Sequence, residues 1–407
     1  MVGGPDVDAR IELMNELRDE YELTAAGTSR DLTGRFEATP FPYEFYPMAR
    51  GVRPFSDLRA VWRLIRLYRR LRPDLIHSFD TKPCVFARLA ARFAGVPRIV
   101  GTIPGLGALY AKEGLATRVV RRVYESLQHR ACRVSDMTVF QNPDDYEQYV
   151  SRGVVDAESA MIIPGSGVKT GELHRAQFTP EMRHALRDEL GIPQDAVVIT
   201  LVSRLIRSKG VIEYARAAET ITREHPHARF LLVGPNDRES VDRLSEREAS
   251  RVFAGTQWIG ERRDVPLILA ASDIFVLPSF YREGIPRVLL EAASMELPLV
   301  TTDSPGCNQA VLYEQNGFLV APRDAGALTD AIRRLVVDAP LRERFGAMSR
   351  RIAVERFDLA VIARQTRELY DRVLRGMPPD STGAPSSRAR SAAAADGQSS
   401  PAGSSVT

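Results

Sequence analysis

The sequence predicts an α/β protein built from two Rossmann-like domains, and three observations support this fold class. Short apolar runs rich in β-branched residues alternate with helical patterns, which is typical of parallel βαβ units. These runs form two successive series, separated by the glycine-rich, polar segment Gly165–Arg175. The chain has 407 residues, 44% apolar and 26% charged, which is enough for two domains with large cores.

Five strands are expected in each half of the chain, and the residues that follow them are the candidates for a ligand site. In the first half the expected strands are Tyr21–Ala25, Asp74–Ser78, Arg98–Thr102, Met137–Gln141 and Ala160–Pro164. In the second half they are Val197–Ser203, Arg229–Gly234, Thr256–Gly260, Asp273–Ser279 and Pro298–Thr302. Ligands of such sheets bind beyond the carboxyl ends of the strands.

The beginning of the chain departs from this pattern. A Rossmann-like domain opens with an apolar strand and a glycine-rich turn, but only Met1 and Val2 precede Gly3-Gly4, and a helical pattern follows at Asp8–Leu17. Either the start lies inside a longer gene, or the domain has lost its first strand. A vacant central position in the sheet is costly, which favours the first alternative.

Charge, cysteine content and hydropathy exclude several classes of protein. A net charge of +3 gives no global indication of a nucleic-acid partner. Cys84, Cys132 and Cys307 are widely spaced and lack metal-ligand spacing, which indicates reduced thiols in a cytoplasmic protein. No apolar run approaches the ~20 residues that span a bilayer, and no signal peptide is recognisable, so we expect any membrane contact to be peripheral.

The most informative segment is Phe280–Gly306, in which Glu283 and Glu291 stand with seven residues between them. Glu283 follows an apolar strand, and Glu291 lies one to two turns into a helix expected to open with Pro286 as its first residue. The start of that helix directs free N–H groups and a positive dipole end toward the surroundings of Glu283. A nucleotide-sugar, which carries hydroxyls on both sides of its charge, suits this site.

Arg204 and Lys209 add positive charge after the strand Val197–Ser203. Fixed cations neutralise a leaving diphosphate without proton transfer, and Arg offers a forked donor where Lys offers a compact charge. Such a pair is usually solvated, but its place between a strand and a helix favours ligand binding. Gly210 permits a sharp entry into the helix that begins near Val211.

Together these segments resemble the E-x7-E signature of retaining family 4 glycosyltransferases with the GT-B fold. The resemblance also covers Ser203–Ala218, Phe230–Pro235, Ile259–Ser279 and Asn316–Ile332, and in the first half His77–Pro83 and Gly101–Gly107. The motifs of the first half resemble the subset that builds capsule, O-antigen and exopolysaccharide on a polyprenyl-diphosphate lipid.

The resemblance implies the roles of the donor-side residues and the domain order. Glu283 would accept hydrogen bonds from the donor sugar, Glu291 would hold the ribose diol, and the amides of Gly284 and Ile285 would contact the sugar or diphosphate. The catalytic candidates are Arg204, Lys209 and Glu283. The implied parts are an acceptor-binding domain over residues 1–168, a nucleotide-sugar domain over 169–354, a crossover helix over 355–376 and a disordered Ser/Pro/Ala/Gly-rich tail over 377–407.

Two departures from the family pattern are visible. Family members commonly have Gly, in a left-handed conformation, where this chain has Glu296, and Glu there costs ~1 kcal/mol. Many members also carry a His after the strand Arg98–Thr102, where this chain has Gly105-Leu106-Gly107. That His is not carried over, and the glycines let backbone approach the reacting centre instead.

On the acceptor side, His77, Asp80 and Lys82 follow a strand and are expected to face the cleft. Asp80 or His77 would orient or deprotonate the acceptor hydroxyl, and Lys82 would meet an acceptor diphosphate. The alternative is a hydrogen-bonded loop that only packs the domain. We expect no cofactor and no metal, because no Asp-x-Asp motif or acidic cluster lies in a suitable loop.

Ser56–Arg72 predicts an amphipathic helix capped by Ser56, with one apolar stripe and one basic stripe. The apolar stripe comprises Leu58, Val61, Ile65 and Tyr68, and the basic stripe comprises Arg59, Arg63, Arg66 and Arg70. A second basic helix is expected over Thr117–Arg130. Such helices bind anionic membrane surfaces or form a solvated face, and their place in the acceptor domain favours the membrane.

The resulting hypothesis is a cytoplasmic enzyme, peripheral on the inner face of the membrane. It would transfer a hexose-type sugar from a UDP-sugar to a lipid-diphosphate-linked saccharide with retention. A soluble acceptor and a catalytically silent sugar-nucleotide-binding protein are the alternatives.

Overall fold

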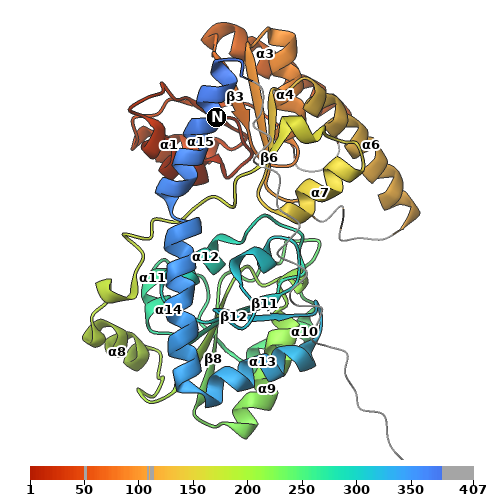
Figure 1. Ribbon diagram of the computed structural model, residues 1–407. Coiled ribbons are helices and arrows are strands. Elements are labelled where there is room, and N and C mark those ends of the chain that lie inside the picture. The colour runs from red at the N-terminus through yellow and green to blue at the C-terminus, as the bar shows by residue number, and fades with distance from the viewer. Residues whose placement is uncertain (50–52, 108–109, 111–113, 378–407) are drawn as a thin grey trace, which may run out of the picture.

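The computed structural model describes residues 1–49, 53–107, 110 and 114–377. Each half of the chain forms parallel sheet covered by helices, so the molecule has two stacked α/β domains (Figure 1). The predicted fold class is confirmed. The tail over 377–407 lies, apart from Met377, outside the described residues.

The strands of the first domain run parallel in two groups that a single residue joins. They are β1 (Ala25–Gly27), β2 (Tyr43–Phe45), β3 (Leu75–Ser78), β4 (Arg98–Ile103), β5 (Met137–Phe140) and β6 (Ala160–Ile162). β1 pairs with β2, and the other group has the order β3-β4-β5-β6. Val2 forms parallel bridges to Ala26 of β1 and to Ser78 of β3.

The central position of this sheet, between β1 and β3, is occupied, so the vacancy that a lost first strand would leave is not found in the described residues. Val2 lies between β1 and β3, where its N–H donates to the carbonyl of His77 at 2.9 Å and its carbonyl accepts from Phe79 at 2.8 Å. On the other side Gly3 donates to Ala26 at 2.9 Å. Backbone groups of both neighbouring strands are therefore hydrogen-bonded to Val2 and Gly3. Gly3-Gly4 follows as the turn at the edge of the sheet.

Helices cover both faces of the first sheet. They are α1 (Ile11–Leu17), α2 (Thr33–Glu37), α3 (Pro54–Leu71), α4 (Pro83–Ala94), α6 (Leu115–Arg133) and α7 (Pro143–Ser151), with 3-10 turns η1 (Val7–Arg10), η2 (Arg30–Leu32) and η3 (Ala157–Ser159). α3, α4 and α6 lie side by side on one face, whereas α1 lies on the other (Figure 1).

The second domain contains one parallel sheet with the order β12-β11-β10-β7-β8-β9. Its strands are β7 (Val197–Val202), β8 (Ala228–Val233), β9 (Gln257–Trp258), β10 (Ile274–Leu277), β11 (Leu299–Thr302) and β12 (Gly317–Val320). The chain leaves β7 toward β8 on one side and returns to β10 on the other. The topological switch point, where α/β proteins bind ligands, therefore lies between β7 and β10.

Four described helices of the second domain begin at polar residues whose side chains cap them. The helices and 3-10 turns of this domain are η4 (Arg175–Gln177), α8 (Pro180–Glu189), η5 (Arg207–Lys209), α9 (Val211–Glu224), α10 (Glu246–Gly255), α11 (Val265–Ala270), α12 (Arg287–Ser294), η6 (Cys307–Ala310), α13 (Ala325–Val337) and α14 (Ala339–Arg356). Thr179 caps α8, Ser245 forms a capping box on α10, and Asp338 caps α14.

The last helix, α15 (Leu359–Leu374), returns to the first domain, as expected (Figure 1). Its residues Ile362, Leu369 and Tyr370 pack in one core cluster with Leu13 and Leu17 of α1. Asp358 caps the helix and also binds Thr170 of the connection between the domains. The break between α14 and α15 therefore lies where the chain passes from one domain to the other.

Several local predictions are wrong. α3 begins at Pro54 with Arg53 as its N-cap, so Ser56 does not cap it. Leu58 is exposed rather than part of the packed stripe, because α3 buries the side that carries Ala60, Leu64 and Leu67. The first described strand of the sheet is Ala25–Gly27 rather than Tyr21–Ala25, and β2 and β12 were not predicted.

Candidate active site

Lys209 and Glu283 come together at the switch point of the second domain. Lys209 ends η5 after β7, and Glu283 lies in the loop after β10. The Lys209 ammonium donates to Glu283 Oε1, and the Ser279 hydroxyl donates to the same oxygen at 3.3 Å. The two charged side chains are only 12% and 23% exposed. Partial burial strengthens such a pair and holds both groups in a fixed orientation.

Gly210 is required for this arrangement. Its φ of 73° is left-handed, and a Cβ there would lie 2.1 Å from the carbonyl oxygen of Pro278. The loop after β7 can therefore lie against the loop after β10 only with glycine at this position. The predicted sharp entry into α9 at Val211 is confirmed.

Arg204 lies at the rim rather than in the pair. Its side chain is 55% exposed and pairs with Asp237 at 2.8 Å. The structure thus places Arg204 on the same switch point as Lys209, but free to reorient toward an anionic ligand. An exposed pair of this kind contributes little stability, so exchanging Asp237 for a ligand costs little.

The start of α12 provides backbone donors beside Glu283. The helix begins at Arg287, with Pro286 as N-cap, one residue later than predicted. In the described part of the chain, the N–H groups of Gly284 and Ile285 have no hydrogen-bond acceptor. The Ile285 side chain is buried in the core, which fixes this backbone in place. Free donors ahead of a helix start suit an anionic ligand.

Glu291 has a charged partner, as its apolar neighbours suggested. Arg287 donates to Glu291 at 3.0 Å, one turn along α12, and pairs at 2.6 Å with Glu12 of α1 in the first domain. Glu291 therefore belongs to an ion-pair group that joins the domains. A ribose diol that binds Glu291 would share this carboxylate with Arg287.

The Gly105-Leu106-Gly107 loop of the first domain packs directly on the Glu283 loop. A Cβ at Gly105 would lie 2.4 Å from the carbonyl carbon of Glu283 and 2.6 Å from the nitrogen of Gly284. Gly107 N–H donates to the carbonyl of Arg282 at 2.7 Å. Backbone of one domain thus contacts backbone of the other, beside the Lys209–Glu283 pair.

The acceptor-side candidates are not all in the cleft. His77 is wrong as a cleft residue: it is 3% exposed on β3, with Nδ1 at 2.7 Å from Tyr370 Oη and Nε2 at 2.7 Å from Thr102 Oγ1. Burial lowers the pKa of His77 well below its usual value, so the ring is neutral. Lys82 pairs with Asp57 of α3 and donates to the Ala49 carbonyl, so it joins α4 to α3.

Asp80 remains at the edge of the first sheet. It follows β3 with a left-handed φ of 69° and accepts from Gly4 N–H at 2.7 Å. Burial and the carboxylate of Asp6 raise the pKa of Asp80, while Arg10 and the Gly4 N–H oppose this shift. Val2 and β3 are neighbours at the centre of this sheet, so Asp80 occupies a position comparable to that of Glu283 in the second domain.

Comparisons with known proteins agree with this geometry. Residues 182–352 match the model for "Glycosyl transferases group 1", and residues 8–165 match the "Glycosyl transferase 4-like domain". The two models account for both domains. The chain is a family 4 glycosyltransferase with the GT-B fold.

Two relatives illustrate the family, and one solved structure shows the fold. The glycosyltransferase is 29% identical over 72% of its length, and 74% of the relative's, to the UDP-Gal:alpha-D-GlcNAc-diphosphoundecaprenol alpha-1,3-galactosyltransferase of Escherichia coli. It is 28% identical, over 82% of this chain and 86% of the relative, to the N,N'-diacetylbacillosaminyl-diphospho-undecaprenol alpha-1,3-N-acetylgalactosaminyltransferase of Campylobacter jejuni. Anabaena HepE, solved with UDP-glucose, has a TM-score of 0.74 at 21% identity, covering 91% of this chain and 98% of HepE, and shows the fold.

Sequence reasoning missed a buried ion pair that holds the glycosyltransferase domains together. Arg282, next to Glu283, donates at 2.9 Å to Asp145 of α7, which is fully buried. Burial raises the pKa of Asp145, although Asn142 and Arg282 oppose this shift. The signal available in the sequence was the polar run after the strand Met137–Phe140, but nothing in it named Arg282 as the partner.

No group of three or more His, Cys, Asp or Glu side chains in the described ranges is arranged to hold a metal ion. None of the described helices is long and apolar enough to cross a membrane.

Proposed function

We propose that this glycosyltransferase transfers a hexose-type sugar from a UDP-sugar to a lipid-diphosphate-linked saccharide, with retention of configuration, in cell-surface polysaccharide synthesis. The observation that carries the proposal is the Lys209–Glu283 pair at the switch point, beside the free amides of Gly284 and Ile285 and against the Gly105 loop. The substrates that the two relatives are named for support a UDP-sugar donor and a lipid-diphosphate acceptor.

On the donor side, the position of each residue gives its proposed role. Lys209 and Arg204 neutralise the charge that develops on the leaving diphosphate, and the amides of Gly284 and Ile285 add fixed dipoles. Glu283 accepts hydrogen bonds from sugar hydroxyls and stays oriented by Lys209. No metal ion enters these steps. We further propose that Glu291 holds the ribose.

On the acceptor side, Asp80 is the candidate for orienting or deprotonating the attacking hydroxyl. A carboxylate with a raised pKa is a better base than an exposed one, and Asp80 lies at the edge of the first sheet. The family pattern contains no carboxylate that could act as a nucleophile. We therefore propose that the acceptor hydroxyl attacks the donor sugar from the front face, through an oxocarbenium-like state. The hydroxyl enters on the side from which the diphosphate departs, which gives retention.

The first domain is proposed to dock on the inner face of the membrane through α3 and α6. On α3, Phe55 is 92% exposed and Trp62 is 55% exposed, with Arg66 lying over the Trp62 ring. On α6, Leu115 and Val119 are exposed beside Arg118. Exposed apolar side chains with interspersed Arg favour an anionic lipid surface, where each Arg adds ~1 kcal/mol.

The transfer proposal is tested by UDP release and product analysis. The enzyme is incubated with a panel of UDP-sugars and lipid-linked acceptors extracted from membranes. Lys209→Ala and Glu283→Ala should each lower turnover by about two decades, because a lost clamp on the transition state costs ~3 kcal/mol. Lys169→Ala, which removes a surface lysine paired with Glu172, is the matched control. Near wild-type turnover in either site variant would refute the assignment.

Membrane docking is tested separately by liposome co-sedimentation. Reversing Arg59, Arg63 and Arg66 to Glu should abolish binding to anionic vesicles. The control reverses three arginines of the second domain, Arg216, Arg223 and Arg247. Binding by the wild type should fall as salt rises toward 1 M, since the Debye length shrinks from ~8 to ~3 Å. If the α3 variant sediments as well as the wild type, α3 is an ordinary solvated face.

A further inference from the structure

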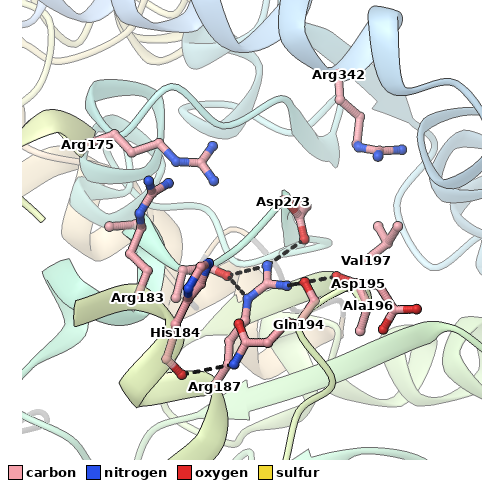
Figure 2. A pocket seen from close by; sticks show the side chains of 12 residues that line it. Arg175, Arg183, His184, Arg187, Gln194, Asp195, Ala196, Val197, Asp273 and Arg342 are labelled. Atoms are coloured by element: carbon pink, nitrogen blue, oxygen red, sulfur yellow. Dashed lines mark hydrogen bonds and ion pairs between the residues drawn. The ribbon is translucent and has the colours of Figure 1, made fainter. Parts of the chain in front are cut away.

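A cavity of about 280 Å³ lies at the edge of the second sheet opposite the donor site (Figure 2). Val197, the first residue of β7, and Asp273, just before β10, line it. The Lys209 and Glu283 loops follow the other ends of the same strands. Six residues of β7 separate the two edges by about 20 Å, so the cavity is distinct from the donor site.

Arginine dominates the lining of this cavity. Arg175 of η4, Arg183 and Arg187 of α8, and Arg342 of α14 line it, with Arg342 apart from the other three (Figure 2). Asp195 and Asp273 are the aspartates of the lining. The four arginines and two aspartates leave an excess of two positive charges. Such an excess in a concave site attracts an anion.

Arg187 has a structural role. Its guanidinium donates to the carbonyls of Ala271, Gln194 and Ala196 and pairs with Asp273 at 2.9 Å. These contacts join α8 to the ends of the strands, and they pair Asp273 with Arg187. Arg342 likewise donates to the carbonyls of Leu335 and Val336. Neither residue needs a ligand to be satisfied.

Arg175 and Arg183 differ from these two. The Nε of each is buried without a hydrogen-bond partner, and within the described ranges neither side chain forms an ion pair. Burial lowers the pKa of Arg175; Asp273 opposes this shift, and Arg183 adds to it. Figure 2 shows both guanidinium groups directed into the same space. An unpaired buried donor costs free energy, which an anion between the two would recover.

We propose that this cavity binds the phosphate group of a phosphorylated small molecule, held between Arg175 and Arg183. Arginine binds phosphate through paired N–H donors, and two such residues suit a dianion. The cavity volume of about 280 Å³ leaves room for a diphosphate or a sugar phosphate.

A ligand in this cavity would affect how the segment between the two domains is held. Arg175 lies in the connection between the domains, whereas Arg183 lies on α8 of the second domain. Arg350 of α14 also binds this connection through the carbonyls of Thr170 and Leu173. A phosphate between Arg175 and Arg183 would therefore fix the connecting segment to the second domain at a second point.

The experiment measures binding to the full chain by isothermal titration calorimetry in a phosphate-free buffer. The probes are inorganic phosphate, pyrophosphate and glucose 6-phosphate, and the tightest of them identifies the ligand class. Arg175→Gln combined with Arg183→Gln should weaken its binding at least about tenfold, the loss expected for charged hydrogen bonds to phosphate. The matched control is Arg247→Gln, an exposed arginine of α10 on the other side of the domain (Figure 1).

Two further measurements separate this cavity from the donor site and from simple loss of structure. Saturating UDP, which fills the proposed donor site, should leave binding of the probe unchanged, whereas Arg175→Lys with Arg183→Lys should keep most of the affinity. The double glutamine variant should unfold at the same temperature as the wild type or higher, because it removes two half-buried guanidinium groups whose Nε atoms lack a hydrogen-bond partner. The proposal is overturned if the wild type binds no probe, if the double glutamine variant binds normally, or if saturating UDP abolishes binding.

Discussion

Gly105→Ala is the substitution that most directly tests the contact between the domains. The Cβ of alanine would lie 2.4 Å from the carbonyl carbon of Glu283 and 2.6 Å from the nitrogen of Gly284. Carbon atoms in contact are ~3.5–4.0 Å apart, so the two loops must separate by about 1 Å. Gly105 does not have a positive φ, so alanine fits its backbone and the substitution affects the contact alone.

The expected result is a loss of transfer without a loss of donor binding. A displacement of about 1 Å at reacting groups costs on the order of a hundredfold in rate, or ~2.7 kcal/mol. The donor residues Lys209, Glu283 and Glu291 all lie in the second domain, so UDP affinity should stay within about threefold of wild type. Steady-state kinetics and calorimetry with UDP measure the two quantities.

Two glycine controls complete this test. Gly34→Ala, in α2 of the same domain, meets no atom within 4 Å and should behave as wild type. Gly107→Ala meets only the Tyr281 hydroxyl at 3.6 Å but has a φ of 65°, so it should lower stability by ~1 kcal/mol with a smaller effect on rate. If Gly105→Ala keeps its kcat within about threefold, the domains do not need this backbone contact for transfer.

Three further predictions follow from the site and its supports. Turnover in excess EDTA should stay within about twofold of that with Mg²⁺, because Lys209 and Arg204 supply the charge; restoration of a lost activity by Mg²⁺ or Mn²⁺ would contradict this. His77 is neutral in the folded protein, whereas in the unfolded chain it binds a proton below pH ~6.5. The free energy of unfolding of the wild type should therefore fall by up to ~2 kcal/mol between pH 6.5 and 5. Urea titrations of His77→Gln should not show this loss. Arg282→Ala removes the charged partner of the buried Asp145 carboxylate and should weaken the domain interface by ~1–3 kcal/mol. Hydrogen exchange should become faster in α7 and change little in α9. Unchanged exchange in α7 would refute this prediction.

The meeting of Lys209 and Glu283 was predictable because both residues lie close to strand ends. Parallel strands bring their carboxyl ends to one edge of a sheet, so Lys209 and Glu283 meet although 74 residues separate them. Gly210 was predictable for the same local reason, since it directly precedes the helix that begins at Val211 and permits a sharp entry into it. Glu296 indeed has a positive φ of 62° at the end of α12, where family members carry glycine.

The acceptor side was less predictable because long-range contacts decide it. His77 binds Tyr370, 293 residues later on the returning helix α15, and Lys82 binds Asp57 on α3. No spacing within a single motif indicates these partners. A polar residue near a strand end is a cleft residue only if no later segment covers it, and α15 covers His77.

The two domains carry their candidate residues at corresponding edges of their sheets. In the second domain the switch point between β7 and β10 carries Lys209 and Glu283, whereas in the first domain the junction of Val2 with β3 carries Asp80. The second domain thus holds the proposed clamp for the leaving group, and the first domain holds the candidate base. Besides the Arg282–Asp145 pair, the domains are joined by backbone, through Gly105 on one side and Gly284 on the other, where a Cβ would lie 2.2 Å from the Pro104 carbonyl oxygen. Because this backbone contact leaves no space for a side chain, the approach of the two domains at this point depends on these two glycines.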